Sequence, residues 1–333
     1  MMRTKPLFSW AGWIFFLFTT LIHLPSFAQD KAISEYPLAS VRIVVPFAPG
    51  GATDVLARLI AVELTGSLKQ TFIVENKPGG GGNIGSSQVA RSKPDGLTLL
   101  MGAAGNIAIN PSLFANMPYN PLTDLTPVAL MGSSMNVLVV PASLPVHSVK
   151  ELIVLAKKQP GKLNYASSGN GGTLHLSGEL FDITSGTKMI HVPYQGSGPA
   201  MVDLLAGRVE MMFDNLPSSM PHIQNGSLRP LGVTSKKRSA SLPNVPTIAE
   251  SGLPDYEVTT WFGIFAPAGT PVQIVNKLNS AINEALKKPA LISRLEGLGA
   301  EVAVGTAQEF TTLVAADSKK WADVIKKAGI VMN

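Results

Sequence analysis

The chain has 333 residues, no cysteine and a formal net charge of +5. The lack of cysteine excludes disulfides, a lipid-modified cysteine, thiolate catalysis and cysteine-based zinc sites. The five histidines show no metal-binding spacing, so we expect neither a metal nor another cofactor. The one short basic cluster, at 236–238, has no interleaved aromatic residues, so we expect no nucleic-acid partner.

The N-terminus has the pattern of a secretory signal peptide. Two basic residues precede an apolar stretch at 7–24, and residues 26–28 have the small-x-small pattern that signal peptidase reads. We therefore predict that 1–28 is a signal peptide cleaved after Ala28, which places the mature chain in the periplasm. An uncleaved membrane anchor is the alternative, since the apolar stretch is near the minimum length for a span.

The most informative stretch follows at 41–54, with the sequence VRIVVPFAPGGATD. It predicts a buried strand, a sharp turn at Pro49-Gly50-Gly51 and a helix over 55–68 with an apolar face. Free N–H groups at a helix N-terminus favour an anion, and glycines let a ligand approach the backbone. The turn is therefore a candidate carboxylate or phosphate site, with an ordinary strand-to-helix turn as the alternative.

The next segments alternate between strand and helix patterns, which is typical of parallel α/β layering. We predict strands at 72–75, 98–101, 128–131 and 137–140, and helices at 83–91 and 149–158. Ile84 and Val89 are expected to face inward on the first of these helices. The region around 132–134 is read as a crossover between two lobes.

A second strand–glycine turn–helix unit occupies 163–176, with the sequence LNYASSGNGGTLHL. A strand at 163–166 leads into a loop of serines and glycines, and a helix follows over about 173–180. The loop offers hydroxyls from Ser167, Ser168 and Thr173 as well as exposed amides. Two such sites in one chain predict two domains that face each other across a cleft.

The remaining pattern completes two lobes. We predict strands at 190–193, 209–213, 228–234, 259–266 and 301–304, and helices at 197–206, 271–287, 289–298 and 307–329. The strand at 259–266 is a second crossover, after which the chain returns to the first lobe. The predicted boundaries are therefore 29–132 plus 259–333 for lobe 1 and 133–258 for lobe 2.

Seven motifs in this order resemble the Bug-type extracytoplasmic solute receptors, the substrate-binding components of tripartite tricarboxylate transporters. They are PFAPGGATD (46–54), VENKPGGGGNIGSSQVARSKPDGLTLL (74–100), INPSLF (109–114), LNYASSGNGGTLHLSGELF (163–181), HVPYQGSGPAMVDLLAGRVEMMFDN (191–215), GVTSKKRSASLPNVPTIAESGLPDYEV (232–258) and WFGIFAPAGTP (261–271). The resemblance covers nearly all of the mature chain. It implies a two-lobe, periplasmic-binding-protein-like (Venus flytrap) α/β fold with two crossover strands.

The resemblance also implies a pocket that holds a small carboxylate largely through backbone amides and ordered waters. Matched residue by residue, its ligand-binding positions are Phe47, Ala48, Gly50, Gly51, Ala52, Thr53, Asp54, Asn83, Ala104, Asn106, Ser167, Ser168, Gly169, Gly172, Thr173, His175, Tyr194, Gln195, Gly196 and Asp214.

Several of these residues also have a structural interpretation. Asp54 could cap its own helix, and His175 could steady the serine–glycine loop from behind. Tyr194 could pack at the rim, and Asp214, at a strand end, could form an Asx turn.

The sequence thus favours a non-catalytic, monomeric receptor for a small carboxylate, which delivers its ligand transiently to the permease subunits of a tripartite transporter. A ligand-presenting sensor receptor is one alternative, because its binding chemistry would be the same. An exported hydrolase using Ser168, His175 and Asp214 is another, although the chain has no GxSxG elbow.

Overall fold

The computed structural model describes residues 1–2 and 35–328, so nearly all of the predicted signal peptide lies outside the described residues. The strands are β1 Val41–Val45, β2 Phe72–Asn76, β3 Thr98–Ala103, β4 Leu125–Pro141, β5 Asn164–Ser167, β6 Ile190–Pro193, β7 Met211–Asn215, β8 Leu228–Val233, β9 Thr259–Pro267 and β10 Ala300–Val302. The helices are α2 Ala52–Leu68, α3 Asn83–Ala90, α4 Asn110–Leu113, α5 Pro121–Asp124, α6 Val149–Lys158, α7 Gly172–Ser185, α8 Ser197–Leu205, α9 Leu216–Gln224, α10 Val272–Leu286, α11 Pro289–Gly297 and α12 Ala307–Ala328. Two short helical turns complete them, η1 Gly80–Gly82 and η2 Gly105–Ile109.

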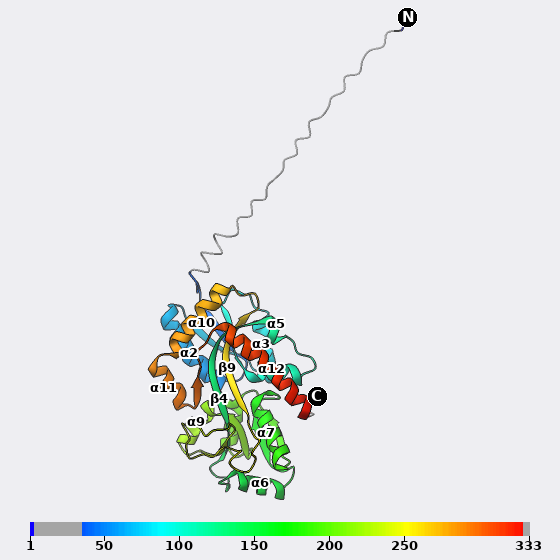
Figure 1. Ribbon diagram of the computed structural model, residues 1–333, viewed down its shortest axis with the longest axis vertical. Coiled ribbons are helices and arrows are strands. Elements are labelled where there is room, and N and C mark those ends of the chain that lie inside the picture. Colours follow the sequence, from blue (N-terminus) through cyan, green and yellow to red (C-terminus); the bar gives the residue numbers. More distant parts are fainter. Residues whose placement is uncertain (3–34, 329–333) are drawn as a thin grey trace.

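The strands form two sheets that share β4. In the first sheet the order is β2-β1-β3-β9-β4, with β10 on the far side of β4. In the second, β4 pairs with β8 on one side and with β7 on the other, and β5 and β6 follow. We name the half built on the first sheet the first lobe and the half built on the second sheet the second lobe. Figure 1 shows β4 and β9 running side by side between them.

The two strands predicted at 128–131 and 137–140 are in fact one strand, β4. Its pairing with β9 extends to Met135, and its pairing with β7 begins at Asn136, so the strand changes sheets without a break. A register shift between Leu130 and Gly132 accommodates the small residues that the sequence pattern read as a gap. The predicted lobe boundaries stay a prediction.

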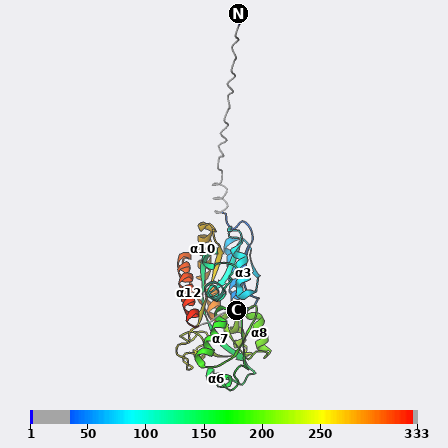
Figure 2. The same cartoon turned by 90° about the vertical axis from the view of Figure 1, so that its right-hand side faces the viewer.

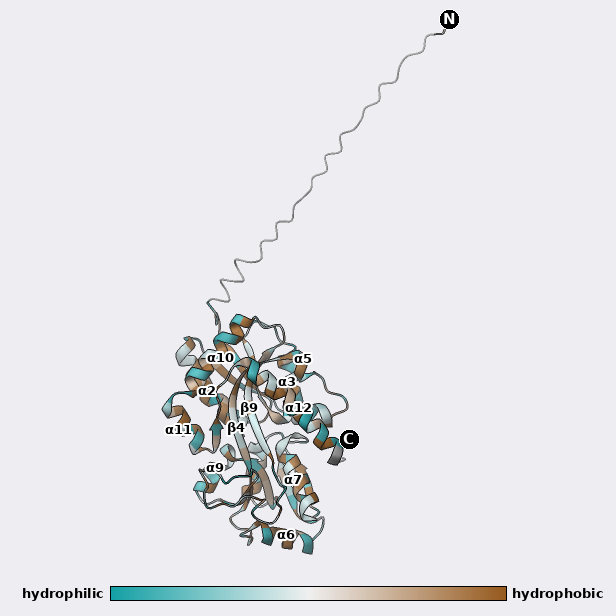
Figure 3. Ribbon diagram, viewed as in Figure 1, coloured by the Kyte–Doolittle hydropathy of each residue, from teal (hydrophilic) through white to brown (hydrophobic). Residues whose placement is uncertain are grey.

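Helices cover the sheets with apolar faces, as Figure 3 shows by their alternating colours. Leu56, Leu59, Ile60 and Leu64 of α2 are all buried, as the 3.6-residue period predicts. On α3 the prediction is half wrong: Val89 is buried, but the side chain of Ile84 is 59% exposed.

The end of the chain returns to the first lobe through α10, α11 and α12. Figure 2 shows α12 (red) along one side of the molecule. Its Phe310 packs edge-on against Trp261 of β9, with ring centroids 5.4 Å apart. Within the described residues no helix combines the length and apolar character needed to cross a membrane.

Candidate functional site

The turn between β1 and α2 is held by Asp54. Its carboxylate accepts hydrogen bonds from the Gly50 amide at 3.1 Å and from Asn76 Nδ2 at 3.0 Å, and Arg58 pairs with it at 2.9 Å. Burial alone would raise the pKa of Asp54, but these donors outweigh it and hold the pKa below its usual value. Asp54 therefore braces the turn, and Gly50, with φ +93°, supplies the left-handed conformation that the turn requires.

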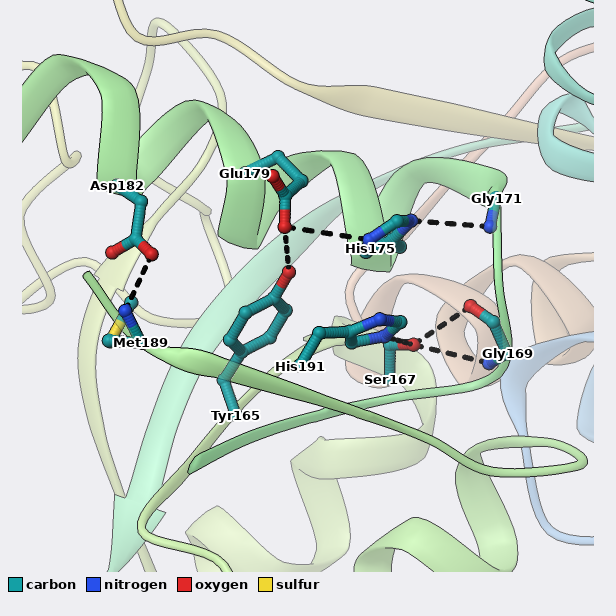
Figure 4. A network of polar contacts seen from close by, with 9 residues as sticks. All are labelled: Tyr165, Ser167, Gly169, Gly171, His175, Glu179, Asp182, Met189 and His191. Carbon is teal, nitrogen blue, oxygen red and sulfur yellow. Dashed lines mark hydrogen bonds and ion pairs between the residues drawn. The ribbon is translucent and has the colours of Figure 1, made fainter. Parts of the chain in front are cut away.

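The loop between β5 and α7 is fixed from behind by two histidines (Figure 4). His175 Nδ1 accepts the Gly171 amide at 3.3 Å, which leaves the ring proton on Nε2, 3.5 Å from Glu179 Oε1. His191 Nε2 lies 2.6 Å from Ser167 Oγ, and the Ser167 hydroxyl also accepts the Gly169 amide at 3.2 Å. The hydroxyl of Ser167 is therefore committed to the loop itself.

The two imidazoles stack with ring centroids 3.9 Å apart. Burial, reinforced by the neighbouring His175, lowers the pKa of His191 to about 3, so its ring is neutral near pH 7. Hydrogen bonding to His175 and to the Tyr165 hydroxyl lowers the pKa of Glu179 to about 2 despite partial burial. This network ties the loop to α7 through His175 and to β6 through His191.

Two further helices, α8 and α9, begin beside the turn before α2 and the loop before α7. The hydroxyl of Ser197, the first residue of α8, donates to Asp214 at 2.7 Å, and the hydroxyls of Ser218 and Ser219 donate to the same carboxylate. Complete burial raises the pKa of Asp214, and these donors oppose that shift. Asn215, the last residue of β7, is the N-cap of α9, and its side chain is tied to Asn136 at 2.7 Å.

These segments enclose a pocket between the two lobes. Its lining comes from both lobes and consists of Phe47, Gly51, Ala52, Thr53, Gly81, Ala103, Gly105, Ser168, Gly169, Asn170, Gly171, Gly172, Thr173, Leu174, Ser197, Asn215 and Thr260. Among these described residues no side chain is charged.

The pocket is nevertheless suited to an anion because four helices begin at it. The first residues of α2, α7 and α8 line the pocket, and so does Asn215, the N-cap of α9; none of the four N-caps is closed by a side-chain hydrogen bond. The first N–H groups of a helix have no partner within the helix, and the helix dipole places partial positive charge there. Backbone groups thus supply the positive potential that charged side chains do not.

A second hollow adjoins the pocket and shares Phe47, Gly81 and the 168–170 loop with it. Its other lining residues are Gly79, Gly80, Gly82, Phe114, Pro193, Tyr194 and Gln195. The Tyr194 hydroxyl donates a hydrogen bond to Asp203 at 2.8 Å, and the residue lines this second hollow.

The structure brings about half of the predicted site residues to these surfaces. The pocket is lined by Phe47, Gly51, Ala52, Thr53, Ser168, Gly169, Gly172 and Thr173, and the outer hollow by Tyr194 and Gln195.

The other predicted residues lie behind or beside the lining. Asp54, Ser167, His175 and Asp214 support loops through the bonds given above. Asn106 bonds the Ala103 amide and the Ser86 hydroxyl, and Asn83 accepts from Asn110. Ala48, Gly50, Ala104 and Gly196 are also outside the lining.

The lining residues that are absent from the predicted ligand-binding positions include Ser197, Asn215 and Thr260. Ser197 could have been found, because it begins the predicted helix at 197–206. Asn215 could have been found, because it lies just past the end of the predicted strand at 209–213. Thr260 had no such signal, since it is an ordinary β9 residue that reaches the pocket only through the crossover.

The structure does not join Ser168, His175 and Asp214, the three residues of the hydrolase alternative, by hydrogen bonds. His175 is engaged by Gly171 and Glu179, and Asp214 by three serines, so neither is hydrogen-bonded to Ser168. No cluster of three potential metal ligands occurs in the described part of the chain.

Comparison with known proteins agrees with this geometry. BugT of Bordetella pertussis is 39% identical over 303 residues, which cover 91% of this chain and 93% of BugT. A solved structure of an R. palustris protein with adipate is 43% identical, with a TM-score of 0.86 over 89% of this chain and all of that one. MatC from Rhodopseudomonas palustris with bound malate is 35% identical, with a TM-score of 0.83 over 87% of this chain and all of MatC.

The fold is therefore that of the periplasmic solute-binding proteins, a curled α/β structure of two lobes, as the sequence predicted. Residues 56–330 match the family described as the tripartite tricarboxylate transporter family receptor, and the chain belongs to that family. The predicted resemblance to Bug-type receptors is confirmed.

Proposed function

We propose that the chain captures a small carboxylate in the pocket between its lobes and delivers it to the membrane permease of a tripartite transporter. The observation that carries this proposal is the charge-free pocket at which four uncapped helices begin. Such a site selects an anion small enough to reach amides from both lobes. Relatives with adipate and with malate support the choice of a carboxylate.

In this proposal the turn at Gly51 to Thr53 holds one carboxylate group from the first lobe. The loop from Ser168 to Thr173 engages the ligand from the second lobe, with the Ser168 hydroxyl as an added donor. Binding then shifts an equilibrium between open and closed arrangements toward the closed one, because only the closed arrangement makes both sets of contacts.

The test is a thermal-shift screen of the mature chain, from Gln29 onward, against mono-, di- and tricarboxylates, amino acids and aromatic acids. A ligand present at 100 times its dissociation constant adds about 2.7 kcal/mol to the free energy of unfolding. We expect adipate, malate or another small carboxylate to raise the melting temperature. The uncharged adipamide is the matched control for adipate and should have no effect.

A flat response from every carboxylate, obtained with protein that had been unfolded, dialysed and refolded to remove any trapped ligand, would contradict the proposal. Delivery is tested separately, by uptake of the labelled ligand in cells with and without the receptor. Export is tested by the N-terminal sequence of the secreted protein, which should start at Gln29.

A further inference from the structure

Backbone atoms of the two lobes approach one another closely around the pocket. The Ala48 amide of the first lobe donates to the Gln195 carbonyl of the second at 2.8 Å. Nearby, glycines of the two lobes face each other: Gly50 against Gly198, Gly81 against Gly169, and Gly105 against Gly172. We call this set of three pairs the glycine seam.

We propose that Gly198 is a positioning residue for ligand capture: its missing Cβ lets the lobes close far enough for both to reach the ligand. The inference rests on the proposed function, and it assigns a role to a residue that does not line the pocket. Gly198 would thus influence affinity without touching the ligand.

A side chain at Gly198 would clash with the backbone of the first lobe. A Cβ built there would lie 2.0 Å from the carbonyl oxygen of Pro49, and its three nearest atoms all belong to Pro49 and Gly50 of the first lobe. Contacts of that length do not occur between real atoms, so the lobes would have to separate locally by about 1 Å or more. A side chain at Gly198 would therefore destabilise the closed arrangement of the lobes relative to the open one.

The backbone of the second lobe does not require a positive φ at this position. Gly198 is the second residue of α8, and the ring of Pro199 after it mildly disfavours a helical residue with a Cβ. The contact with the other lobe is the larger constraint, because it would bring a Cβ to 2.0 Å from the Pro49 carbonyl oxygen.

Gly105 shows a similar close approach at another point of the glycine seam. A Cβ built there would lie 2.9 Å from the Cα of Gly172, and its other near neighbours are also backbone atoms of the second lobe. Gly51 shows the contrast, because a Cβ there would lie 3.4 Å from Ser197 Cβ, an ordinary contact. The tight approach is thus confined to particular positions.

Affinity follows from closure because the pocket is lined from both lobes. If only the closed arrangement binds fully, the apparent dissociation constant rises in proportion as the closed fraction falls. A gap of about 1 Å also lengthens every hydrogen bond from one lobe to a ligand held by the other.

The test compares Gly198→Ala and Gly198→Leu with Gly66→Ala. Gly66 also lies in a helix, α2, but a Cβ there meets nothing within 4 Å, so it is the matched control. For the carboxylate that binds the wild-type chain best in the screen, we expect affinity to fall at least tenfold in Gly198→Ala and not to change in Gly66→Ala. The ligand-free melting temperature should not fall in Gly66→Ala and should fall only slightly in Gly198→Ala, whose Cβ precedes Pro199 in the helix. An unchanged affinity in Gly198→Ala would overturn the inference.

A second readout does not depend on knowing the ligand. Because the chain has no cysteine, the pair Gly51→Cys and Ser197→Cys can report closure through disulfide formation in a glutathione buffer. Their Cβ atoms would lie 3.4 Å apart in the closed arrangement, close to the separation of about 3.5 to 4.5 Å in disulfides. Adding Gly198→Leu should slow trapping at least tenfold, whereas adding Gly66→Ala should not.

The two readouts separate the inference from the proposed function. If no carboxylate binds the wild-type chain, the proposed function fails. A trapping rate that Gly198→Leu leaves unchanged would overturn the inference that Gly198 permits closure. Slower trapping combined with unchanged affinity would also overturn the inference. Should Gly198→Ala fail to fold, Gly105→Ala is the replacement in the trapping assay alone, because Gly105 lines the pocket; trapping should again be slower, and an unchanged rate would overturn the inference.

Discussion

Replacing Asp54 with alanine should destabilise the protein rather than remove a ligand contact. The carboxylate of Asp54, a residue only 4% exposed, accepts hydrogen bonds from Gly50 and Asn76. Bonds to a charged group contribute about 1.5 to 3 kcal/mol each and are not additive, so the expected loss is about 2 to 4 kcal/mol. Arg58 adds little, because its side chain is 53% exposed and water screens the pair.

Chemical denaturation of the wild-type chain, Asp54→Ala and the control Arg58→Ala measures these losses. Arg58→Ala should cost no more than about 1 kcal/mol. The contribution of Asp54 should also depend on pH in a defined direction. Since its folded pKa is below the ordinary 3.8, the stabilisation is present above that pH and is lost as the pH falls further. Wild-type stability in Asp54→Ala, combined with loss of ligand binding, would refute the bracing role and make Asp54 a ligand contact.

Three further predictions concern the pocket and its supports. Gly51→Val should abolish binding in a calorimetric titration while leaving the melting temperature nearly unchanged, because the valine methyl groups extend beyond the permitted Cβ into the pocket; unchanged affinity would exclude the first turn from the site. His191 has a folded pKa of about 3 against an ordinary 6.5, so its contribution to stability is lost as the pH falls from 6.5 toward 3. In His191→Gln, stability should therefore decline less over that range, and equal declines in the two proteins would contradict a neutral His191. Asp214→Asn should lower the free energy of unfolding by about 1 to 3 kcal/mol, because a fully buried acceptor of three hydroxyls is replaced; wild-type stability on urea denaturation would show that the charge is not required.

The sequence predicted the elements with strong local signals. The turn before α2 and the loop before α7 both combine a short strand, glycines and an apolar helix face, and both line the pocket. The apolar face of α2 follows from periodicity alone. These features depend on neighbours in the chain, which is why they can be read from it.

Features that depend on distant neighbours were harder to predict. The small residues at 132–134 looked like a break in β4, but pairing with β9 and β10 keeps that segment extended. Helix α9 was not predicted, because Pro217 and Pro221 discourage a helix assignment, although Pro217 occupies the first turn, where proline is tolerated. Ser167 looked like a ligand hydroxyl until His191, 24 residues away in sequence, was found beside it.

The charge-free lining determines how a bound anion can be released. Backbone amides neither gain nor lose a proton in the range where proteins are folded, so acidity cannot switch off the donors of the pocket. Added salt also has little effect, since screening acts mainly on exposed charges. Under the proposed function, release of the ligand therefore depends on the separation of the two lobes, and a permease that binds the open arrangement better than the closed one would favour it.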